Sequence, residues 1–276
     1  MAADPAPAAS AAPAADSADA VAPLLSVAGL TVRYGGVVAL DSVSLSVPAG
    51  GFVGLIGPNG AGKTTFVDAL TGFARYSGEV RFNGARLDSE PAHVRARHGL
   101  ARTFQSGGVF DDLTVEENIL VGERNKAGWR SAVASVLSGR SAPASPATRE
   151  IIGSLGLSGF LGMQAEELSE GQRKLVSVAQ ALASKPKLLL LDEPAAGLDS
   201  AESSWLGQQL LAVRDSGVAI LLVDHDMDLV VSVCDELVVL DFGKVIAVGP
   251  PSEVMADPLV VAAYLGSVVP TAEELT

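Results

Sequence analysis

Apolar and polar residues alternate along residues 24–34 and 37–47, and Gly35 and Gly36 lie between the two stretches. A period of two places alternate side chains on opposite faces of a strand, and a glycine pair between two such stretches marks a turn. The pattern predicts a β-hairpin. Two further short strands are expected at 79–82, before an Asn-Gly turn, and at 100–105.

Three short stretches are apolar without alternation: 51–57, 187–192 and 218–223. Strands of a parallel sheet are buried on both faces and therefore form continuous apolar runs. Helices are expected after them at 64–71, 201–215 and 227–235, and a hairpin that turns at Phe242-Gly243 is expected at 236–248. Buried strands that alternate with helices predict an α/β fold.

The region from about 106 to 185 differs, because its apolar residues recur with helical spacing. Helices are expected at 111–125, 149–161 and 169–184, whereas 128–147 is rich in Ser, Ala, Gly and Pro and is interpreted as a loop or a weak helix. The middle of the chain is thus expected to form a helical subdomain within the α/β frame.

The two ends of the chain are expected to be tails. Residues 1–23 consist mostly of Ala, Pro, Ser and Asp, without a basic start or a continuous apolar stretch. This composition predicts a disordered tail and does not match a signal peptide. One folded domain is expected at 24–266, followed by a short tail at 267–276.

The composition narrows the classes of function. The chain has 276 residues, of which 48% are hydrophobic, and a net charge of −13. Its apolar runs are shorter than the roughly 20 residues of a membrane-spanning helix, so contact with a membrane is expected to run through a partner. The net negative charge argues against nucleic acid as a partner. The single cysteine, Cys234, excludes an internal disulfide and predicts a buried thiol in a reducing cytoplasm.

The clearest chemistry lies in a glycine-rich segment between an expected strand and an expected helix. Its sequence is Gly57-Pro58-Asn59-Gly60-Ala61-Gly62-Lys63-Thr64-Thr65, which matches G-x-x-x-x-G-K-[ST]. In this setting backbone N–H groups and the helix N-terminus surround the phosphates of a nucleotide. Lys63 is expected to contact the β- and γ-phosphates, and Thr64 to bind Mg²⁺.

Two carboxylates follow the apolar run at 187–192, since Asp192 ends it and Glu193 comes next. Ligands of α/β proteins bind at the carboxyl edge of the parallel sheet. Asp192 is therefore expected in the coordination shell of Mg²⁺, and Glu193 is expected to face the attacking water as general base.

A third motif, Leu168-Ser169-Glu170-Gly171-Gln172, precedes an expected helix. Ser169 and Gln172, three residues apart, are typical of a capping box, which is an ordinary helix start. The same helix N-terminus, with the small residue Gly171, is also suited to hold an anion.

With these motifs in this order, the chain resembles the ATP-binding cassette (ABC) ATPases over about 24–266, and Leu168 to Gln172 looks like their signature motif. Four further positions match the family: Gln105 its Q-loop, Ala196-Gly197-Leu198-Asp199 its D-loop, His225 its switch histidine and Tyr34 the aromatic residue that stacks on adenine. Taken alone, Gln105 would be an ordinary surface residue, His225 a structural one and Tyr34 a strand aromatic.

The resemblance implies a RecA-like α/β core, an antiparallel β subdomain, a helical subdomain and the cofactors ATP and Mg²⁺. It also implies two such subunits, identical or similar, that close head to tail around two ATP molecules. Ser169 and Gly171 of one subunit would face the phosphate loop of the other. The implied catalytic residues are Glu193, His225 and Gln105, and the implied metal site holds Thr64, Asp192 and Gln105.

Several stretches resemble more narrowly the ATPases of branched-chain amino acid importers: 99–105, 117–122, 224–227, 240–246, 257–258 and 264–266. That resemblance implies a subunit at the cytoplasmic face of the cell membrane that powers solute import. Its partners would be integral membrane permeases, a second ATPase subunit and an extracytoplasmic solute-binding protein. The sequence departs from the subfamily at 173–178 and at Asp224, where glutamate is usual.

Two other functions fit the same motifs. One is a soluble ABC ATPase that acts on DNA, ribosomes or iron–sulfur assembly, and the other is the ATPase of a lipid-export system. Many members of the first group carry two ATPase domains, long coiled coils or zinc insertions, whereas this sequence has one phosphate loop and none of those insertions.

Overall fold

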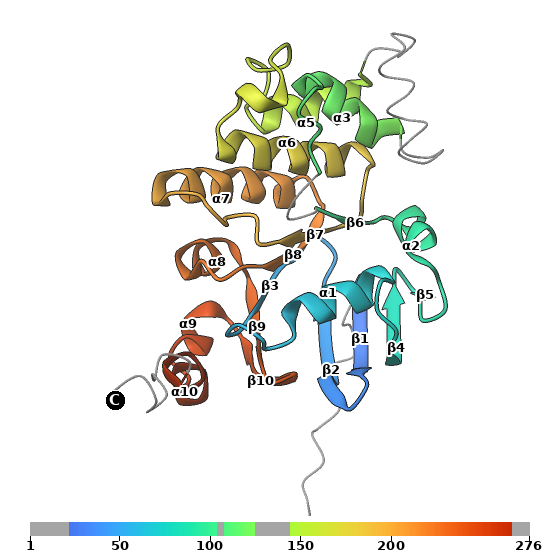
Figure 1. Ribbon diagram of the computed structural model, residues 1–276, viewed down its shortest axis with the longest axis vertical. Helices are drawn as coiled ribbons and strands as arrows, with labels where there is room; N and C mark the ends of the chain where they lie inside the picture. The colour runs from blue at the N-terminus through green and yellow to red at the C-terminus, as the bar shows by residue number, and fades with distance from the viewer. Residues whose placement is uncertain (1–21, 104–107, 125–143, 267–276) are drawn as a thin grey trace, which may run out of the picture.

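The computed structural model describes residues 22–103, 108–124 and 144–266 (Figure 1). Gln105, nearly all of the two expected tails and most of the segment 128–147 lie outside these ranges, so the predictions made for them stay predictions.

Six strands form the central sheet in the order β10-β9-β3-β8-β7-β6. Neighbouring strands run parallel except for β10, which pairs antiparallel with β9. Every residue of β3, β7 and β8 is buried, which confirms the three central strands predicted from the apolar runs. The strands are β3 Phe52–Ile56, β6 Leu100–Arg102, β7 Leu188–Asp192, β8 Ala219–Val223, β9 Glu236–Asp241 and β10 Lys244–Gly249.

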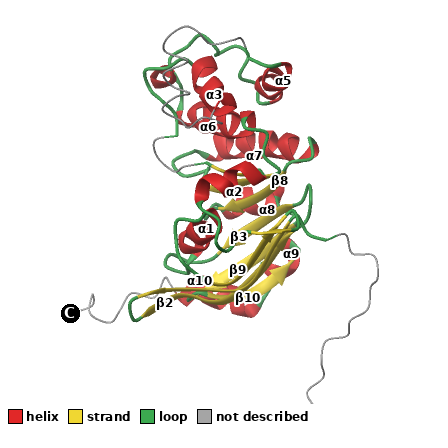
Figure 2. Ribbon diagram, turned by 90° about the vertical axis from the view of Figure 1, so that its right-hand side faces the viewer, coloured by secondary structure: helices red, strands yellow, loops and turns green. Residues whose placement is uncertain are grey.

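Alternate side chains of each central strand enter two separate cores. Leu188 and Leu190 of β7 pack toward α1 (Lys63–Thr71) and the N-terminal strands. Leu189 and Leu191 pack toward the three helices of the opposite face, which are α6 (Glu170–Ala183), α7 (Ser200–Asp215) and α8 (Met227–Val233). Figures 1 and 2 show the sheet between these layers. The carboxyl ends of the central strands are thereby held rigidly from both sides.

A second, antiparallel sheet has the order β2-β1-β4-β5. It comprises β1 Leu25–Tyr34, β2 Val37–Val47, β4 Ser77–Phe82 and β5 Ala85–Arg86. The two turn residues Asn83 and Gly84 both have positive φ, at +49° and +79°, as a tight hairpin turn requires. The hairpin and the strand predicted from the alternating pattern are confirmed.

Helices gather at one end of the molecule, at the top of Figure 1. They are α3 Val115–Arg124, α5 Pro146–Ser154, the short 3-10 helix Ala165–Glu167 and α6. Ser169 and Gln172 form the predicted capping box at the start of α6. The helix predicted at 149–161 is wrong in its bounds, because α5 begins directly after its N-cap Ser145, and Gly156, with φ +67°, follows its end.

Three short helices are not evident from the sequence pattern: α2 Ala92–His98, α9 Pro251–Val254 and α10 Pro258–Gly266. The last turn of helix α2 is basic, and Gly99, in the left-handed conformation, follows it. Both features are typical of a helix C-terminus. Its Arg95 is buried and donates to the carbonyls of Ala69 and Leu70, so α2 fixes the C-terminal end of α1. None of the described helices is long and apolar enough to cross a membrane.

Candidate functional site

The phosphate loop connects β3 to α1 and requires glycine where the backbone is tightest. A Cβ on Gly57 would lie 2.1 Å from the carbonyl oxygen of Leu240 on β9. Gly62, the N-cap of α1, has φ +106°, and a Cβ there would lie 2.8 Å from the Ala39 carbonyl oxygen. Any side chain would be strained at both positions. The motif therefore lies in the strand–loop–helix setting that its sequence predicts.

Lys63 is the first residue of α1, and only 7% of it is exposed. Its Nζ donates to the carbonyl oxygens of Gly57 at 2.6 Å and Pro58 at 3.1 Å. Burial lowers the pKa of this ammonium, and three nearby carboxylates oppose that shift: Glu193, Asp192 and Asp224. A cation is thus placed inside the loop, facing the carboxylates at the ends of β7 and β8.

Asp192 ends β7 and is almost fully buried, with 3% exposed. Its Oδ2 accepts from Arg102 Nη2 at 2.8 Å, while its Oδ1 is buried and accepts no hydrogen bond from any described residue. Arg102 Nη1 also donates to Asp68 of α1, at 2.7 Å. A buried carboxylate oxygen without a donor is suited to bind a cation or an ordered water molecule.

Glu193 follows Asp192 in a left-handed backbone conformation with φ +49°. This conformation is rare for a residue with a side chain and is held here by a hydrogen bond from Glu193 N to the carbonyl oxygen of Val223, at 2.7 Å. The turn places the half-buried side chain of Glu193 at the wall of the same cavity as Lys63. Strain of this kind is concentrated at functional sites.

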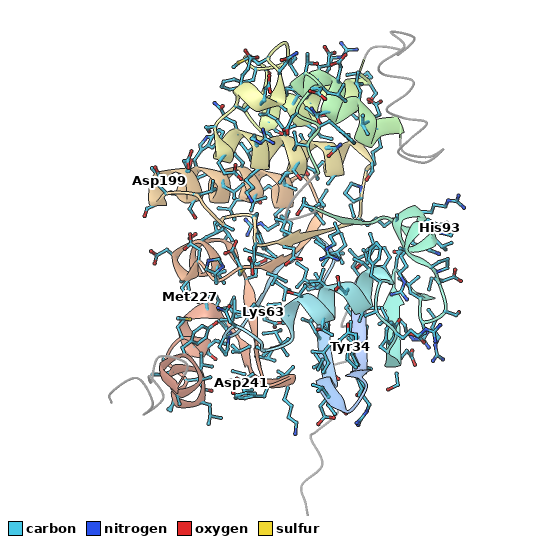
Figure 3. The ribbon with its side chains drawn as sticks, in the orientation of Figure 1. Tyr34, Lys63, His93, Asp199, Met227 and Asp241 are labelled. Carbon is cyan, nitrogen blue, oxygen red and sulfur yellow. The ribbon has the colours of Figure 1, made fainter. Side chains whose placement is uncertain are left out.

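These elements surround a cavity of about 480 Å³. One part of its wall is polar and comes from the phosphate loop, the start of α1 and Glu193, and the other part is apolar and comes from β2 and the β9–β10 turn. Figure 3 labels Lys63, at the centre of the molecule. The lining residues are Val37, Val38, Ala39, Asn59, Gly60, Ala61, Gly62, Lys63, Thr64, Thr65, Glu193 and Phe242.

Asp224, at the end of β8, is a residue to which the sequence alone assigns no role. It is fully buried, and its carboxylate accepts from the backbone N–H groups of Ala195 at 3.0 Å, His225 at 2.7 Å and Asp226 at 3.0 Å. It therefore joins the segment after Glu193 to the segment that carries His225. The His225 side chain is 61% exposed, with Nδ1 3.6 Å from Asp224 Oδ1.

Several residues predicted for the site do not line this cavity within the described part of the chain: Tyr34, Ser169, Gly171, Asp192 and His225. Tyr34 is 55% exposed near the turn between β1 and β2, where Val37 and Val38 reach the cavity instead. Ser169 and Gly171 lie at the start of α6, in the helical end of the molecule (Figure 1).

The fold and the site define a P-loop nucleoside triphosphatase, and comparison with known proteins identifies its family. The family model of the ABC transporter matches residues 40–196, and that of the branched-chain amino acid ATP-binding cassette transporter matches 244–269. The chain belongs to the ABC transporter ATPases, as its motifs predict, and is an ATP-binding, ATP-hydrolysing subunit of a transporter.

Curated relatives are similar over nearly their whole length. The chain is 38% identical over 252 residues to the high-affinity branched-chain amino acid transport ATP-binding protein BraF of Pseudomonas aeruginosa, covering 88% of this chain and 98% of that protein. It is 37% identical over 250 residues to the corresponding protein LivG of Escherichia coli strain K12, with the same coverage.

A solved structure shares the fold. The ADP conformation of an ATP-binding cassette from an ABC transporter superposes with a TM-score of 0.79 and 31% identity, covering 89% of this chain and 100% of that one. A nucleotide-free cassette gives a TM-score of 0.78 and 32% identity, over 88% and 99% of the two chains. The predicted ABC fold class is confirmed.

Proposed function

We propose that this subunit hydrolyses ATP to power the import of branched-chain amino acids, or of closely related solutes, through a partner permease at the cytoplasmic face of the membrane. The observation that supports hydrolysis is the placement of Lys63 and Glu193 in the wall of one cavity. The substrate class is supported by the names of the relatives BraF and LivG and by the C-terminal family match at 244–269.

The phosphate loop holds the triphosphate through its backbone N–H groups and through Lys63. The residues present also fit Mg²⁺, because Thr64 lies in the cavity wall and Asp192 has a buried oxygen without a donor among the described residues. Gln105 completes this set in our proposal. Bound Mg²⁺ would neutralise negative charge that develops on the phosphates.

Glu193 acts as the general base in this scheme. It accepts a proton from the water that attacks the γ-phosphate, and its side chain is directed to the cavity by the strained turn after β7. Asp224 keeps that turn in place through the Ala195 N–H. His225, whose backbone N–H donates to the same carboxylate, would approach the γ-phosphate from outside the wall of this cavity.

A second ATPase subunit completes the site. Ser169 and Gly171 lie at the N-terminus of α6, a 14-residue helix, but outside the wall of the cavity in their own subunit. A helix N-terminus binds anions, so the start of α6 is suited to contact a γ-phosphate held by another copy or by a similar chain. Binding and hydrolysis of ATP would then close and open the pair, and the helical end would transmit the movement to the permease. An extracytoplasmic solute-binding protein would deliver the solute.

The test is transport by the complex purified with its membrane partners and placed in liposomes. ATP enclosed on the side of this subunit should drive movement of leucine, isoleucine or valine, and Lys63→Ala should abolish it. Purification of this subunit from solubilised membranes without any accompanying membrane protein would refute the transport role. A membrane complex that hydrolyses ATP but moves none of the three amino acids, with solute-binding protein present, would refute the import of branched-chain amino acids and leave only the related solutes to be tested.

A further inference from the structure

Phe242 lies at the tip of the hairpin between β9 and β10. Without a ligand, its exposure and its backbone conformation are both energetically unfavourable. Phe242 is 87% exposed, which is the highest value among the large apolar residues of the described part of the chain. Its backbone is left-handed, with φ +41°, a conformation that is an outlier for a bulky residue. Such a combination is expected where a residue contacts a ligand.

The hairpin tip is fixed against the phosphate loop and β2. Gly243 N donates to the carbonyl oxygen of Ala61 at 3.0 Å, and Asp41 N donates to the carbonyl oxygen of Gly243 at 2.8 Å. The approach is close, because a Cβ on Gly243 would lie 2.6 Å from the Ala39 carbonyl oxygen. The position of Phe242 is therefore set by the same loop that receives the phosphates, and its side chain extends from a firmly held backbone.

Phe242 shares the cavity wall with Val37 and Val38, which are 67% and 37% exposed. These three side chains form an apolar rim, whereas Lys63 and Thr64 lie in the polar part of the wall. A nucleotide has the matching division, with a charged triphosphate at one end and, at the other, a base whose flat faces are apolar. Aromatic side chains hold bases by stacking.

We propose that Phe242 contacts the base of the bound nucleotide and, with Val37 and Val38, forms the base-binding rim of the site. The proposal rests on the proposed function, because it presumes that the triphosphate occupies the loop around Lys63. It assigns to the β9–β10 turn a part in nucleotide binding beside that expected of Tyr34. The rim offers no side-chain hydrogen-bonding group, so it would select for a flat ring rather than for a particular base.

The test compares two ligands that differ in the base. Affinities for Mg-ATP and for inorganic triphosphate, which lacks base and ribose, are measured by calorimetry on the purified subunit. Phe242→Ala should weaken Mg-ATP binding by roughly 5- to 100-fold, the range for loss of one stacked base, and leave triphosphate binding unchanged. Phe242→Trp should retain Mg-ATP binding. Phe73→Ala is the matched control, because Phe73 is also exposed, at 64%, but does not line the cavity.

A second variant separates a binding role from a structural one. Phe242→Gly removes the ring and suits a positive φ, so its melting temperature should equal or exceed that of the wild type while Mg-ATP affinity falls. An equal loss of ATP and triphosphate binding, or unchanged ATP binding in Phe242→Ala, would overturn the proposal. Wild-type protein that binds neither ligand would instead refute the proposed function itself, as would a Lys63→Ala variant that binds both normally.

Discussion

Arg102 Nη2 lies 2.8 Å from Oδ2 of Asp192, the carboxylate that ends β7 beside the nucleotide cavity. The same guanidinium reaches Asp68 of α1 through Nη1, at 2.7 Å. Arg102 therefore ties together the ends of β6 and β7 and the helix that begins at the phosphate loop. In the sequence it lies three residues before Gln105, the expected Q-loop glutamine.

We expect Arg102→Met to destabilise the subunit strongly. The change leaves the buried Asp192 charge without its cation, and breaking a buried pair in this way typically costs about 3–5 kcal/mol. The free energy of unfolding is measured with urea. The matched control is Arg81→Met, which breaks a surface pair with Glu79 and should change the unfolding free energy by about 1 kcal/mol or less. Similar effects of the two changes would contradict the role given to Arg102.

Mg-ATP should restore part of the unfolding free energy that Arg102→Met loses, because a cation at the free Asp192 oxygen restores positive charge beside the carboxylate. At the same free concentration of Mg-ATP, the stabilisation should thus be larger in Arg102→Met than in the wild type, because the variant binds the cation more tightly. A smaller stabilisation would indicate that Arg102 itself holds the nucleotide.

The central sheet could be predicted from the sequence because burial on both faces removes the polar alternation, as the four leucines of β7 show. The pairing of Arg102 with Asp192 could not, because these residues are 90 positions apart and no local pattern links them. The exposure of Phe242 likewise depends on the tertiary contact between Gly243 and Ala61. Local patterns identify the elements and motifs, whereas contacts between distant elements decide which side chains share the cavity.

We expect the Cys234 thiol to be unreactive in the folded subunit. It is 8% exposed, and burial, with a smaller effect from Asp235, raises its pKa from 9.0 to about 12. The thiolate is the reactive form, so a thiol reagent at pH 8 should label one group per chain only in denaturant. Labelling of the folded wild type at the rate of the denatured chain would contradict this burial.

The same shift predicts how stability depends on alkaline pH. The folded state keeps the thiol neutral up to about 12, whereas the unfolded thiol ionises near 9.0. The stabilising contribution is therefore fully present below pH 9.0 and is lost as the pH rises through this window. Cys234→Ala should lack this component, so the difference in unfolding free energy between wild type and variant should shrink above pH 9.0.

We expect Asp224→Asn to lower kcat for ATP hydrolysis with little change in KM. The carboxylate accepts three backbone N–H groups, and an amide presents its own donor to at least one of them. The turn after Glu193 and the segment of His225 would then shift, and misplacement of catalytic groups by about 1 Å can lower the rate by about 10²-fold. Steady-state kinetics measure both constants, and a rise in KM with unchanged kcat would point to a role in binding instead.

Glu193→Gln gives the most direct test of the proposed base. The glutamine has the same shape and, as its backbone N–H still reaches Val223 O, should adopt the same turn, but it has no basicity. Loss of a placed general base lowers the rate by about 10²–10⁴-fold, so phosphate release should fall by that order while ATP affinity stays similar. Asp192 remains, so Mg²⁺ should still bind; Asp192→Asn is the contrasting variant and should weaken the metal site itself.

Because ATP is no longer consumed, Glu193→Gln should form an ATP-dependent dimer that size-exclusion chromatography detects and that the wild type forms only briefly. A variant that stays monomeric with ATP would refute the homodimer, and addition of a second, similar ATPase would then test the heterodimer. Undiminished turnover would refute the assignment of Glu193 as base, whatever the oligomeric state.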